Sequence, residues 1–282
     1  MGNPTPFEQA LKAGTPEAAL ALLQADVRAQ PGKAELRVAL FQLLCVLGRW
    51  DKALSQLDVA GQLDAGALAM VQTYREAIAC ERLRGEVFAG RRVPMIFGEP
   101  EPWLAMLVEA LLQDGRGETA LAASLRAQAF DAAPANPGQM DGRAFDWLAD
   151  ADGRIGPVLE AIVNGRYYWV PFAHLSAVSI EAPEDLRDLV WAPAQLSFTN
   201  GGEVVALLPN RYPDLPADAD GALLMARRTE WLPGAGDSYR GLGQRILVTP
   251  EAETALLEVR ELRFDAQDAA DEAEAAAPAA DA

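Results

Sequence analysis

The feature that most constrains this chain is a heptapeptide that recurs in its N-terminal half. The segment GTPEAAL begins at Gly14, and GRWDKAL begins 34 residues later at Gly48. A third copy, GRGETAL, begins at Gly115, 67 residues after Gly48 and so close to two further periods. Around these copies, apolar residues recur at three- and four-residue spacing, as on one face of an α-helix. The N-terminal half is therefore predicted to consist of repeated helical units.

A period of about 34 residues is typical of tetratricopeptide repeats (TPRs), in which each unit is a pair of antiparallel helices. The glycine of each copy can end the first helix by adopting a left-handed backbone conformation. The small Ala19, Ala53 and Ala120 would let paired helices approach closely. The copies carry only part of the consensus, so residues 1–134 are interpreted as degenerate TPR-like repeats that stack on one another. A plain helical bundle is the alternative.

Glycine and proline interrupt the helical pattern twice. Residues 85–101 (GEVFAGRRVPMIFGEPE) are predicted to form a loop, and residues 134–142 (PANPGQMDG) are predicted to separate two domains. Beyond them the apolar spacing becomes that of β-strands, and Asn164-Gly165 has the backbone freedom that a tight hairpin turn needs. We expect strands over 159–163, 166–170, 173–180, 194–199, 203–208, 223–231, 244–249 and 255–264, with a short helix over 183–189.

The predicted fold class is therefore α+β. A TPR-like helical array over residues 1–134 is followed by an antiparallel β-rich domain over residues 143–265. The last segment, residues 266–282, contains ten alanines, five acids and no basic residue, and is expected to be a disordered tail.

Charge and cysteine content narrow the classes of partner and the location. There are 41 acidic and 24 basic residues, giving a net charge of −17. Nucleic acid and anionic membranes are therefore not expected as partners, because both require a basic surface. We find no transmembrane run and no signal peptide pattern. Cys45 and Cys80 lie in apolar helical contexts and are expected to be buried free thiols, which favours the cytoplasm.

Residue patterns for catalysis or metal binding are weak. His174 is the single histidine, and it is expected to be a hydrogen-bonded structural residue because triads and zinc sites need partners at defined spacing. The segment from Asp150 to Arg154 faintly resembles a calcium loop, with Glu160 as a further acid. Arg154 would place a positive charge in that loop, so an Asp-Gly turn with Asp152 paired to an arginine is preferred. No cofactor or metal is predicted.

Six motifs in the C-terminal half resemble those of a known family. They are FDWLADADGRIGPVLE (145–160), NGRYYWVPF (164–172), PEDLRDLVWAPA (183–194), LPNRYP (208–213), ARRTEW (226–231) and GLGQR (241–245). In this order and spacing they are similar to the ImpE family, also called TagJ, of type VI secretion accessory proteins. With the helical start, the resemblance covers roughly residues 5–264. The chain departs from the family pattern at Pro213-Asp214, where the family often has Gly and Ser.

The resemblance implies a function that composition does not show. Proteins of this family are similar to adaptors that bind the N-terminal segment of TssB, the small subunit of the contractile sheath. The family occurs alongside ClpV, the ATPase that disassembles the sheath, and is thought to modulate sheath turnover without catalysis. The resemblance therefore implies a TssB-like sheath subunit as partner, with the ClpV-type ATPase involved at most indirectly.

Two sets of residues are candidates for the binding site or its scaffold. Leu36, Leu40, Leu43 and Leu44 lie on a first repeat helix and either line a groove for an amphipathic helix or belong to the core. The second set combines Arg and aromatic residues of the motifs, and either forms an internal ion-pair network or meets acidic groups of a partner. A scaffold role is preferred for this set, which is Arg154, Trp169, Arg187, Asp188, Trp191, Arg211, Tyr212, Arg227, Trp231 and Arg245.

Two other functions compete with the adaptor. A general TPR-type scaffold or co-chaperone would clamp a C-terminal carboxylate with lysine and asparagine, but the first repeats contain few lysines. An uncharacterised enzyme in the C-terminal domain would need a pocket lined by the arginine and aspartate residues. The adaptor is the favoured hypothesis.

Overall fold

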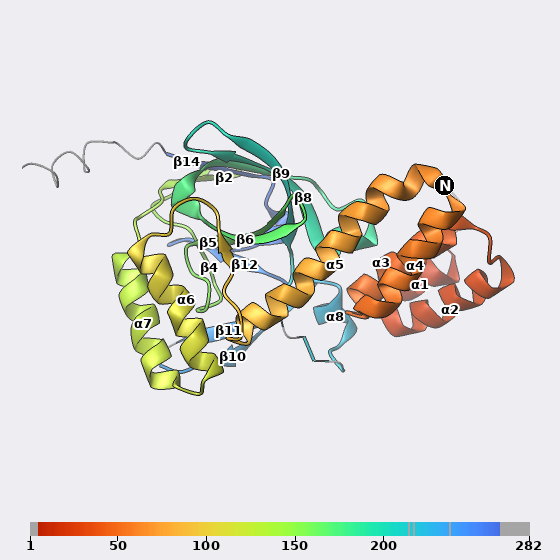
Figure 1. Ribbon diagram of the computed structural model, residues 1–282, viewed down its shortest axis with the longest axis horizontal. Helices are drawn as coiled ribbons and strands as arrows, with labels where there is room; N and C mark the ends of the chain where they lie inside the picture. Colours follow the sequence, from red (N-terminus) through yellow and green to blue (C-terminus); the bar gives the residue numbers. More distant parts are fainter. Residues whose placement is uncertain (1–4, 214, 217, 237, 266–282) are drawn as a thin grey trace, which may run out of the picture.

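The computed structural model describes residues 5–213, 215–216, 218–236 and 238–265. Its fold class is α+β, as predicted, with long helices in the N-terminal half and a nine-stranded sheet in the C-terminal half (Figure 1). None of the helices in these ranges is both long enough and apolar enough to cross a membrane. The predicted tail, residues 266–282, lies outside the described residues.

Four helices form two antiparallel hairpins near the N-terminus. They are α1 (Pro6–Lys12), α2 (Pro16–Ala29), α3 (Ala34–Val46) and α4 (Trp50–Leu63). Gly14 and Gly48 follow the first helix of each hairpin with φ angles of 75° and 64°, which release the chain into the second helix. Ala19 and Ala53 are completely buried in the helical core. The predicted helical hairpins are confirmed here, and their classification as TPR-like stays a prediction.

The third heptapeptide also lies at a helical hairpin, but its predicted register is wrong by two residues. The hairpin consists of α6 (Pro102–Gly115) and α7 (Thr119–Ala132). Gly117 has the left-handed φ angle of 84°, and the buried alanine is Ala122, whereas Ala120 is exposed. Gly117 and Ala122 have the same glycine-to-alanine spacing as the first two copies. The third copy should therefore be aligned from Gly117, and the heptapeptide match that starts at Gly115 is out of register with the structure.

The third hairpin does not stack on the second. After η1 (Ala65–Ala67), the helix α5 (Leu68–Phe88) carries the chain away from α4 to the other end of the molecule (Figure 1). α5 also extends into the segment predicted to be a loop, because the left-handed residue that follows it is Gly90, with φ of 67°, and not Gly85. Beyond it, β1 (Met95–Ile96) pairs in parallel with a strand of the main sheet.

The main sheet has the order β1-β6-β5-β9-β8-β7-β14-β2-β3. Its other strands are β2 (Gly138–Met140), β3 (Arg143–Phe145), β5 (Val158–Val163), β6 (Arg166–Pro171), β7 (Leu175–Ile180), β8 (Trp191–Phe198), β9 (Glu203–Pro209) and β14 (Glu261–Phe264). Two small sheets accompany it, formed by β4 (Ala149–Asp150), β12 (Ile246–Val248) and β13 (Glu253–Ala255), and by β10 (Thr229–Pro233) and β11 (Tyr239–Gly243). The short helices are η2 (Phe172–His174), η3 (Leu186–Leu189), α8 (Gly221–Leu224) and η4 (Leu256–Glu258).

Both predicted strand hairpins are present. β5 and β6 pair as far as Val163 and Arg166, and the turn residues Asn164 and Gly165 have φ angles of 49° and 71°. β8 and β9 form the second hairpin, and η3 falls inside the predicted short helix. The two predicted turns therefore placed β5, β6, β8 and β9, four neighbouring strands of the main sheet, correctly.

Some predicted strands are correct only in part. Segment 223–231 begins as α8, because the carboxylate of Asp220 accepts hydrogen bonds from the N–H groups of Ala222 and Leu223 and caps a helical turn. Segment 255–264 begins with η4 and becomes strand only in β14. The predicted boundary at 134–142 contains β2, in which a Cβ on Gly138 would lie 2.1 Å from the carbonyl oxygen of Arg263. Gly138 therefore permits close pairing of β2 with β14, whereas the sequence pattern predicts a break in the chain at this residue.

The two faces of the main sheet belong to different hydrophobic clusters. On β5, Val158 and Ile162 join a cluster shared with the helices, whereas Leu159 and Ala161 join a cluster on the opposite face. Alternate residues of a strand point to opposite faces, so Glu160 is placed on the face that the helices cover. The helical and β-rich segments therefore share one continuous apolar core.

We predict that Gly115→Ala destabilises the chain. A Cβ at this position would lie 2.7 Å from the carbonyl oxygen of Ala89 and 2.8 Å from the Cα of Gly90, where the ends of α5 and α6 meet. Because both contacts are backbone, the overpacking should lower the free energy of unfolding by about 1–3 kcal/mol in urea denaturation. Gly32→Ala is the control, since nothing lies within 4 Å of its Cβ position. An equal response of the two variants would contradict the contact.

Candidate functional site

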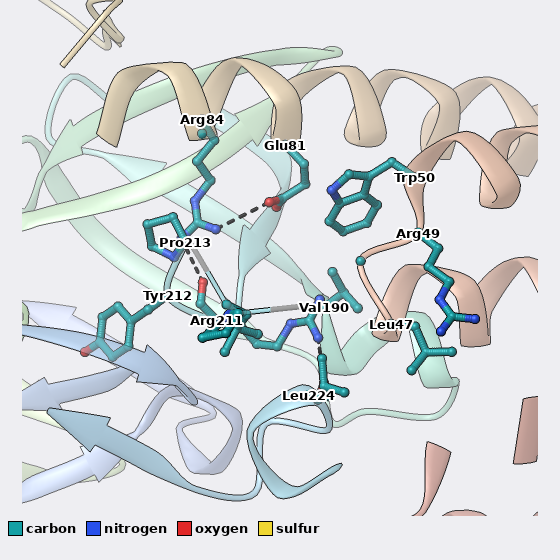
Figure 2. A pocket seen from close by; sticks show the side chains of 14 residues that line it. Leu47, Arg49, Trp50, Glu81, Arg84, Val190, Arg211, Tyr212, Pro213 and Leu224 are labelled. Atoms are coloured by element: carbon teal, nitrogen blue, oxygen red, sulfur yellow. Dashed lines mark hydrogen bonds and ion pairs between the residues drawn. The ribbon is translucent and has the colours of Figure 1, made fainter. Parts of the chain in front are cut away.

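A cavity of about 510 Å³ opens where the helices meet the sheet, and we call it the junction cavity. Its walls come from the α3–α4 turn, from α5, from the segments flanking β8 and β9, and from α8 (Figure 2). The side chains labelled in the figure are Leu47, Arg49, Trp50, Glu81, Arg84, Val190, Arg211, Tyr212, Pro213 and Leu224. Segments from both halves of the sequence therefore form this site together.

Arg211 lines the junction cavity and binds the ends of two helices. Its guanidinium donates to the carbonyl oxygens of Val46 and Leu224, both at 2.6 Å, and to that of Cys45 at 3.2 Å. These carbonyls belong to the last residues of α3 and α8, where backbone dipoles concentrate negative charge. Burial lowers the pKa of Arg211 to about 10, against the opposing effect of Glu81, so the side chain stays charged at neutral pH.

Arg227 holds the end of α1 in the same way. Its guanidinium donates to the carbonyl oxygens of Leu11 and Lys12, at 3.2 and 3.4 Å, and these residues lie three and two positions before Gly14. Arg211 binds Cys45 and Val46, which lie three and two positions before Gly48. Two motif arginines of the β-rich part therefore cap the first helix of each N-terminal hairpin at equivalent positions.

Glu160 lies beneath the junction cavity between two arginines. Arg84 donates from two nitrogens to its two carboxylate oxygens at 2.7 and 2.9 Å, and Arg245 contacts the carboxylate as well. The hydroxyl of Tyr167 donates to the same carboxylate, and the indole N–H of Trp169 donates to that hydroxyl at 2.7 Å. Burial alone would raise the pKa of Glu160, but the two guanidinium groups outweigh it and lower the pKa to about 2. The ionised carboxylate thus joins β5 to α5.

Arg245 extends this network to Asp150. It donates to the carboxylate of Asp150 at 2.6 Å and to the carbonyl oxygen of Pro209 at 2.9 Å. The hydroxyl of Tyr212 also donates to Asp150, at 3.0 Å. Burial raises the pKa of Asp150 to about 6, although Arg245 acts in the opposite direction. Fixed charges therefore link α5, β5 and β4 through the interior.

Arg154 and Asp152 form a separate pair next to this network. The guanidinium donates to both carboxylate oxygens of Asp152, at 2.9 and 2.7 Å, and lies 4.8 Å from the ring centroid of Phe88. The preferred pairing of Asp152 with an arginine is confirmed. Asp150 and Glu160, the other acids of the faint calcium pattern, are the ones bound by Arg245.

The motif residues around η3 pack against α5. The guanidinium of Arg187 lies 4.8 Å from the ring centroid of Tyr74, and the carboxylate of Asp188 accepts hydrogen bonds from backbone N–H groups of its own segment. The ring of Trp191 lies 5.8 Å from those of Tyr74 and Trp50, and its indole donates to Glu81 at 2.9 Å. These residues hold the sheet against the helices.

The remaining aromatic motif residue, Trp231, lies in β10 and packs at 5.7 Å from Tyr212. The structure therefore gathers Trp169, Trp191, Arg211, Tyr212 and Arg245 around the junction and places Arg154, Arg187, Arg227 and Trp231 at its margins. They do not form a single open surface.

The predicted leucine groove is largely buried. Leu40, Leu43 and Leu44 are between 0 and 4% exposed in the helical core, and Leu36 is half-buried. Segment η3 packs on α3, where the backbone N–H of Leu186 donates to the side-chain oxygen of Gln42 at 3.1 Å. Partner binding through these leucines stays a prediction, and their burial argues against it.

His174 is hydrogen-bonded, as expected. Its Nδ1 lies 3.0 Å from the carbonyl oxygen of Phe97, and its Nε2 lies 3.0 Å from the carboxylate of Glu101. Both partners belong to the segment between β1 and α6, so the histidine ties that segment to the sheet.

Sequence reasoning missed Arg84 and assigned Glu160 no structural role. Arg84 lies on the face of α5 that buries Ala77, Ile78 and Val87, and Glu160 interrupts an otherwise apolar strand. A basic residue on an apolar helix face and an acid inside an apolar strand together indicate a buried ion pair. That signal was present in the sequence.

The chemistry of the site is that of fixed charge pairs. Burial raises the pKa of the Cys45 thiol and of the Tyr212 hydroxyl, so neither is ionised at neutral pH. Within the described ranges, no three acidic, cysteine or histidine side chains are grouped so that they could hold a metal ion. The arrangement is suited to holding two halves of a protein together.

We predict that Glu160→Gln lowers the free energy of unfolding by about 3–5 kcal/mol, because Arg84 and Arg245 would lose the buried charge that they share. Only Asp150 would then neutralise Arg245, and only Glu81, at 3.4 Å, would neutralise Arg84. Chemical denaturation measures the change, and loss of any cooperative transition is the extreme form of the same result. Glu17→Gln is the control, since its partner Arg49 lies at the surface, and it should cost about 1 kcal/mol or less. A similar small cost at both positions would contradict the network.

The free energy of unfolding should depend on pH in the way that the lowered pKa of Glu160 predicts. Its pKa is about 2 in the folded chain against an ordinary 4.5, so its contribution is complete above pH 4.5 and is lost as the pH falls through 2. Asp150 acts in the opposite sense, because its folded pKa of about 6 exceeds the ordinary 3.8, and its contribution is lost as the pH rises through 6. We expect the stability difference between wild type and Glu160→Gln to shrink between pH 4.5 and 2 in denaturation series. A difference independent of pH would argue against this assignment.

Comparisons with known proteins bear directly on these motifs. A family model described as ImpE protein matches residues 142–263. A curated protein of Pseudomonas aeruginosa, named type VI secretion system accessory component TagJ, is 55% identical over 262 residues, which cover 93% of this chain and 92% of that protein. A crystal structure of a Vibrio parahaemolyticus protein matches with a TM-score of 0.85 over 94% of this chain and 100% of that chain, at 24% identity, and so supports the fold alone.

The family match contains all six motifs and spans the strands from β3 to β14, except for Phe264 at the end of β14. The curated relative extends the similarity over the helices. The chain therefore belongs to the ImpE family of type VI secretion accessory components, as the resemblance of its motifs predicted.

Proposed function

We propose that the chain is a non-enzymatic adaptor of a bacterial type VI secretion system. In this proposal it binds the N-terminal helix of the small, TssB-like sheath subunit and so modulates sheath disassembly by a ClpV-type ATPase, which it affects indirectly. The observation that carries the proposal is the 55% identity over 93% of the chain with a type VI secretion accessory component. We place the adaptor in the cytoplasm, in keeping with the free thiols of Cys45 and Cys80.

The electrostatics of the junction support a non-enzymatic role. The two buried acids of the ion-pair network, Asp150 and Glu160, are each bound by Arg245, and Arg84 also binds Glu160. A general base must be free to accept a proton from a substrate, and a carboxylate clamped by two guanidinium groups is a poor acceptor. The network therefore favours an interaction protein over the alternative of an enzyme.

The position of η3 favours a dedicated adaptor over a general TPR-type co-chaperone. Leu186 and Leu189 of η3 pack against the helical core, and Leu186 is also hydrogen-bonded to Gln42 of α3. A peptide that entered along α3 would have to displace this segment. The chain itself thus covers a surface that a general TPR clamp would leave open.

Calorimetry with a synthetic peptide tests the proposal. The peptide is the N-terminal segment of the small sheath subunit encoded in the same genome, and we expect a Kd in the micromolar range, as is usual for functional peptide contacts. A C-terminally amidated version should bind equally well, because recognition is through a helix face, whereas a carboxylate clamp would lose binding. A scrambled peptide of the same composition is the control. No binding at about 100 µM peptide would overturn the adaptor function.

A further inference from the structure

A second cavity, apolar and also of about 510 Å³, lies between the third helical hairpin and the β-rich part, away from the junction cavity. We call it the Phe130–Trp147 groove, and it is defined by Phe130, Ala133, Pro134, Trp147, Pro157 and Val248. Its two large aromatic side chains are 38% and 42% exposed, which is unusual for residues of this size. Asp150 is the one charged residue that lines it, and this aspartate is bound by Arg245.

Both aromatic anchors of the groove are held in place by the fold. A Cβ on Gly156 would lie 2.3 Å from the ring of Phe130, so the ring rests directly on a backbone that only glycine provides. The side-chain oxygen of Asn136 accepts a hydrogen bond from the N–H of Leu148 at 2.7 Å, which fixes the segment that carries Trp147. An aromatic pair that is rigid before binding loses little entropy when a partner docks, and such pairs supply much of the binding energy of interfaces.

The charge around the groove indicates the chemistry of its occupant. Asp131 and Asp146, the sequence neighbours of the two aromatic anchors, are both exposed, and among the described residues no basic side chain lines the groove. The chain as a whole carries a net charge of −17. An acidic occupant would be repelled, whereas basic residues beside an apolar surface would be attracted.

We propose that the Phe130–Trp147 groove is the docking site for the partner helix, which presents bulky apolar residues on one face with basic residues beside them. This inference rests on the proposed function and locates it. The inner face of α3 is covered by η3, and Leu40, Leu43 and Leu44 are buried, so a partner helix needs an open apolar surface elsewhere, and the groove provides one. Its volume accommodates several large side chains.

The test is the same calorimetric titration with the sheath peptide, carried out on the full chain and on single variants. Trp147→Ser and Phe130→Ser should each weaken binding at least tenfold, since each removes an anchor. Val205→Ser is the matched control, because Val205 is 76% exposed on β9, which contributes nothing to the groove, and its affinity should stay within twofold. Raising the salt from about 50 to 500 mM should weaken wild-type binding severalfold, because the flanking aspartates are exposed. Thermal midpoints within a few degrees of wild type confirm that the variants are folded.

Three outcomes separate the possibilities. If the wild type binds the peptide and both groove variants bind it equally well, the groove is not the site, although the adaptor function stands. If the wild type does not bind, the adaptor function itself is overturned. If Trp147→Ser converts a dimer to a monomer in sedimentation while peptide affinity is unchanged, a second copy of the chain is the occupant, and the inference fails.

Discussion

The bond between Glu160 and its two arginines is the constraint on which the rest of the structure depends. Glu160 comes from the centre of β5, Arg84 from α5, and Arg245 from the residue before β12, so three segments meet at one carboxylate. Removing these charges from water costs free energy. Their mutual attraction offsets that cost only if the groups lie close together and the carboxylate oxygens accept further hydrogen bonds. The two-pronged contact of Arg84 and the hydroxyl of Tyr167 meet that requirement. An apolar contact would allow α5 to slide along the sheet. The two-pronged hydrogen bonding between Arg84 and Glu160 instead fixes α5 at one position on the sheet.

Two further arginines fix the N-terminal hairpins in position by binding the ends of their helices. Arg211 binds the end of α3 and Arg227 binds the end of α1, each two to three residues before the glycine that turns the chain. Because these cations come from the β-rich part, they orient the hairpins relative to the sheet and add to the shared apolar core. This explains why the most distinctive motifs lie outside the repeat. The arginines of these motifs hold the helical repeats against the β-rich part of the chain.

Sequence alone located what depends on local chemistry. Asn164-Gly165 set the β5–β6 hairpin, and Gly14 and Gly48 set the helix ends, because backbone freedom at a turn is decided within a few residues. The failures have a different origin. Gly115 is predicted to end a helix with a left-handed conformation, and Gly138 is predicted to lie in a chain break. Each is instead required where a second backbone passes within 3 Å of the Cβ position, and such contacts are made by residues distant in sequence. Likewise, nothing local shows that η3 returns to cover α3, or that Arg84 finds Glu160, although the charge of each within an apolar pattern is a readable signal.

The closure of α3 by η3 also decides where a partner can bind at low cost. Opening that face would expose Leu186 and Leu189, break the contact with Gln42, and disturb Asp188, whose backbone carbonyl accepts a hydrogen bond from Asn210. A partner would have to supply all of that free energy before gaining any affinity. The Phe130–Trp147 groove demands no such rearrangement, because its anchors are already fixed by Gly156 and Asn136. The network at Glu160 contributes to this difference, since it holds α5, and the end of α5 contacts the end of α6 in the hairpin that carries Phe130. A buried carboxylate that no partner touches thereby helps to keep the open binding surface in shape.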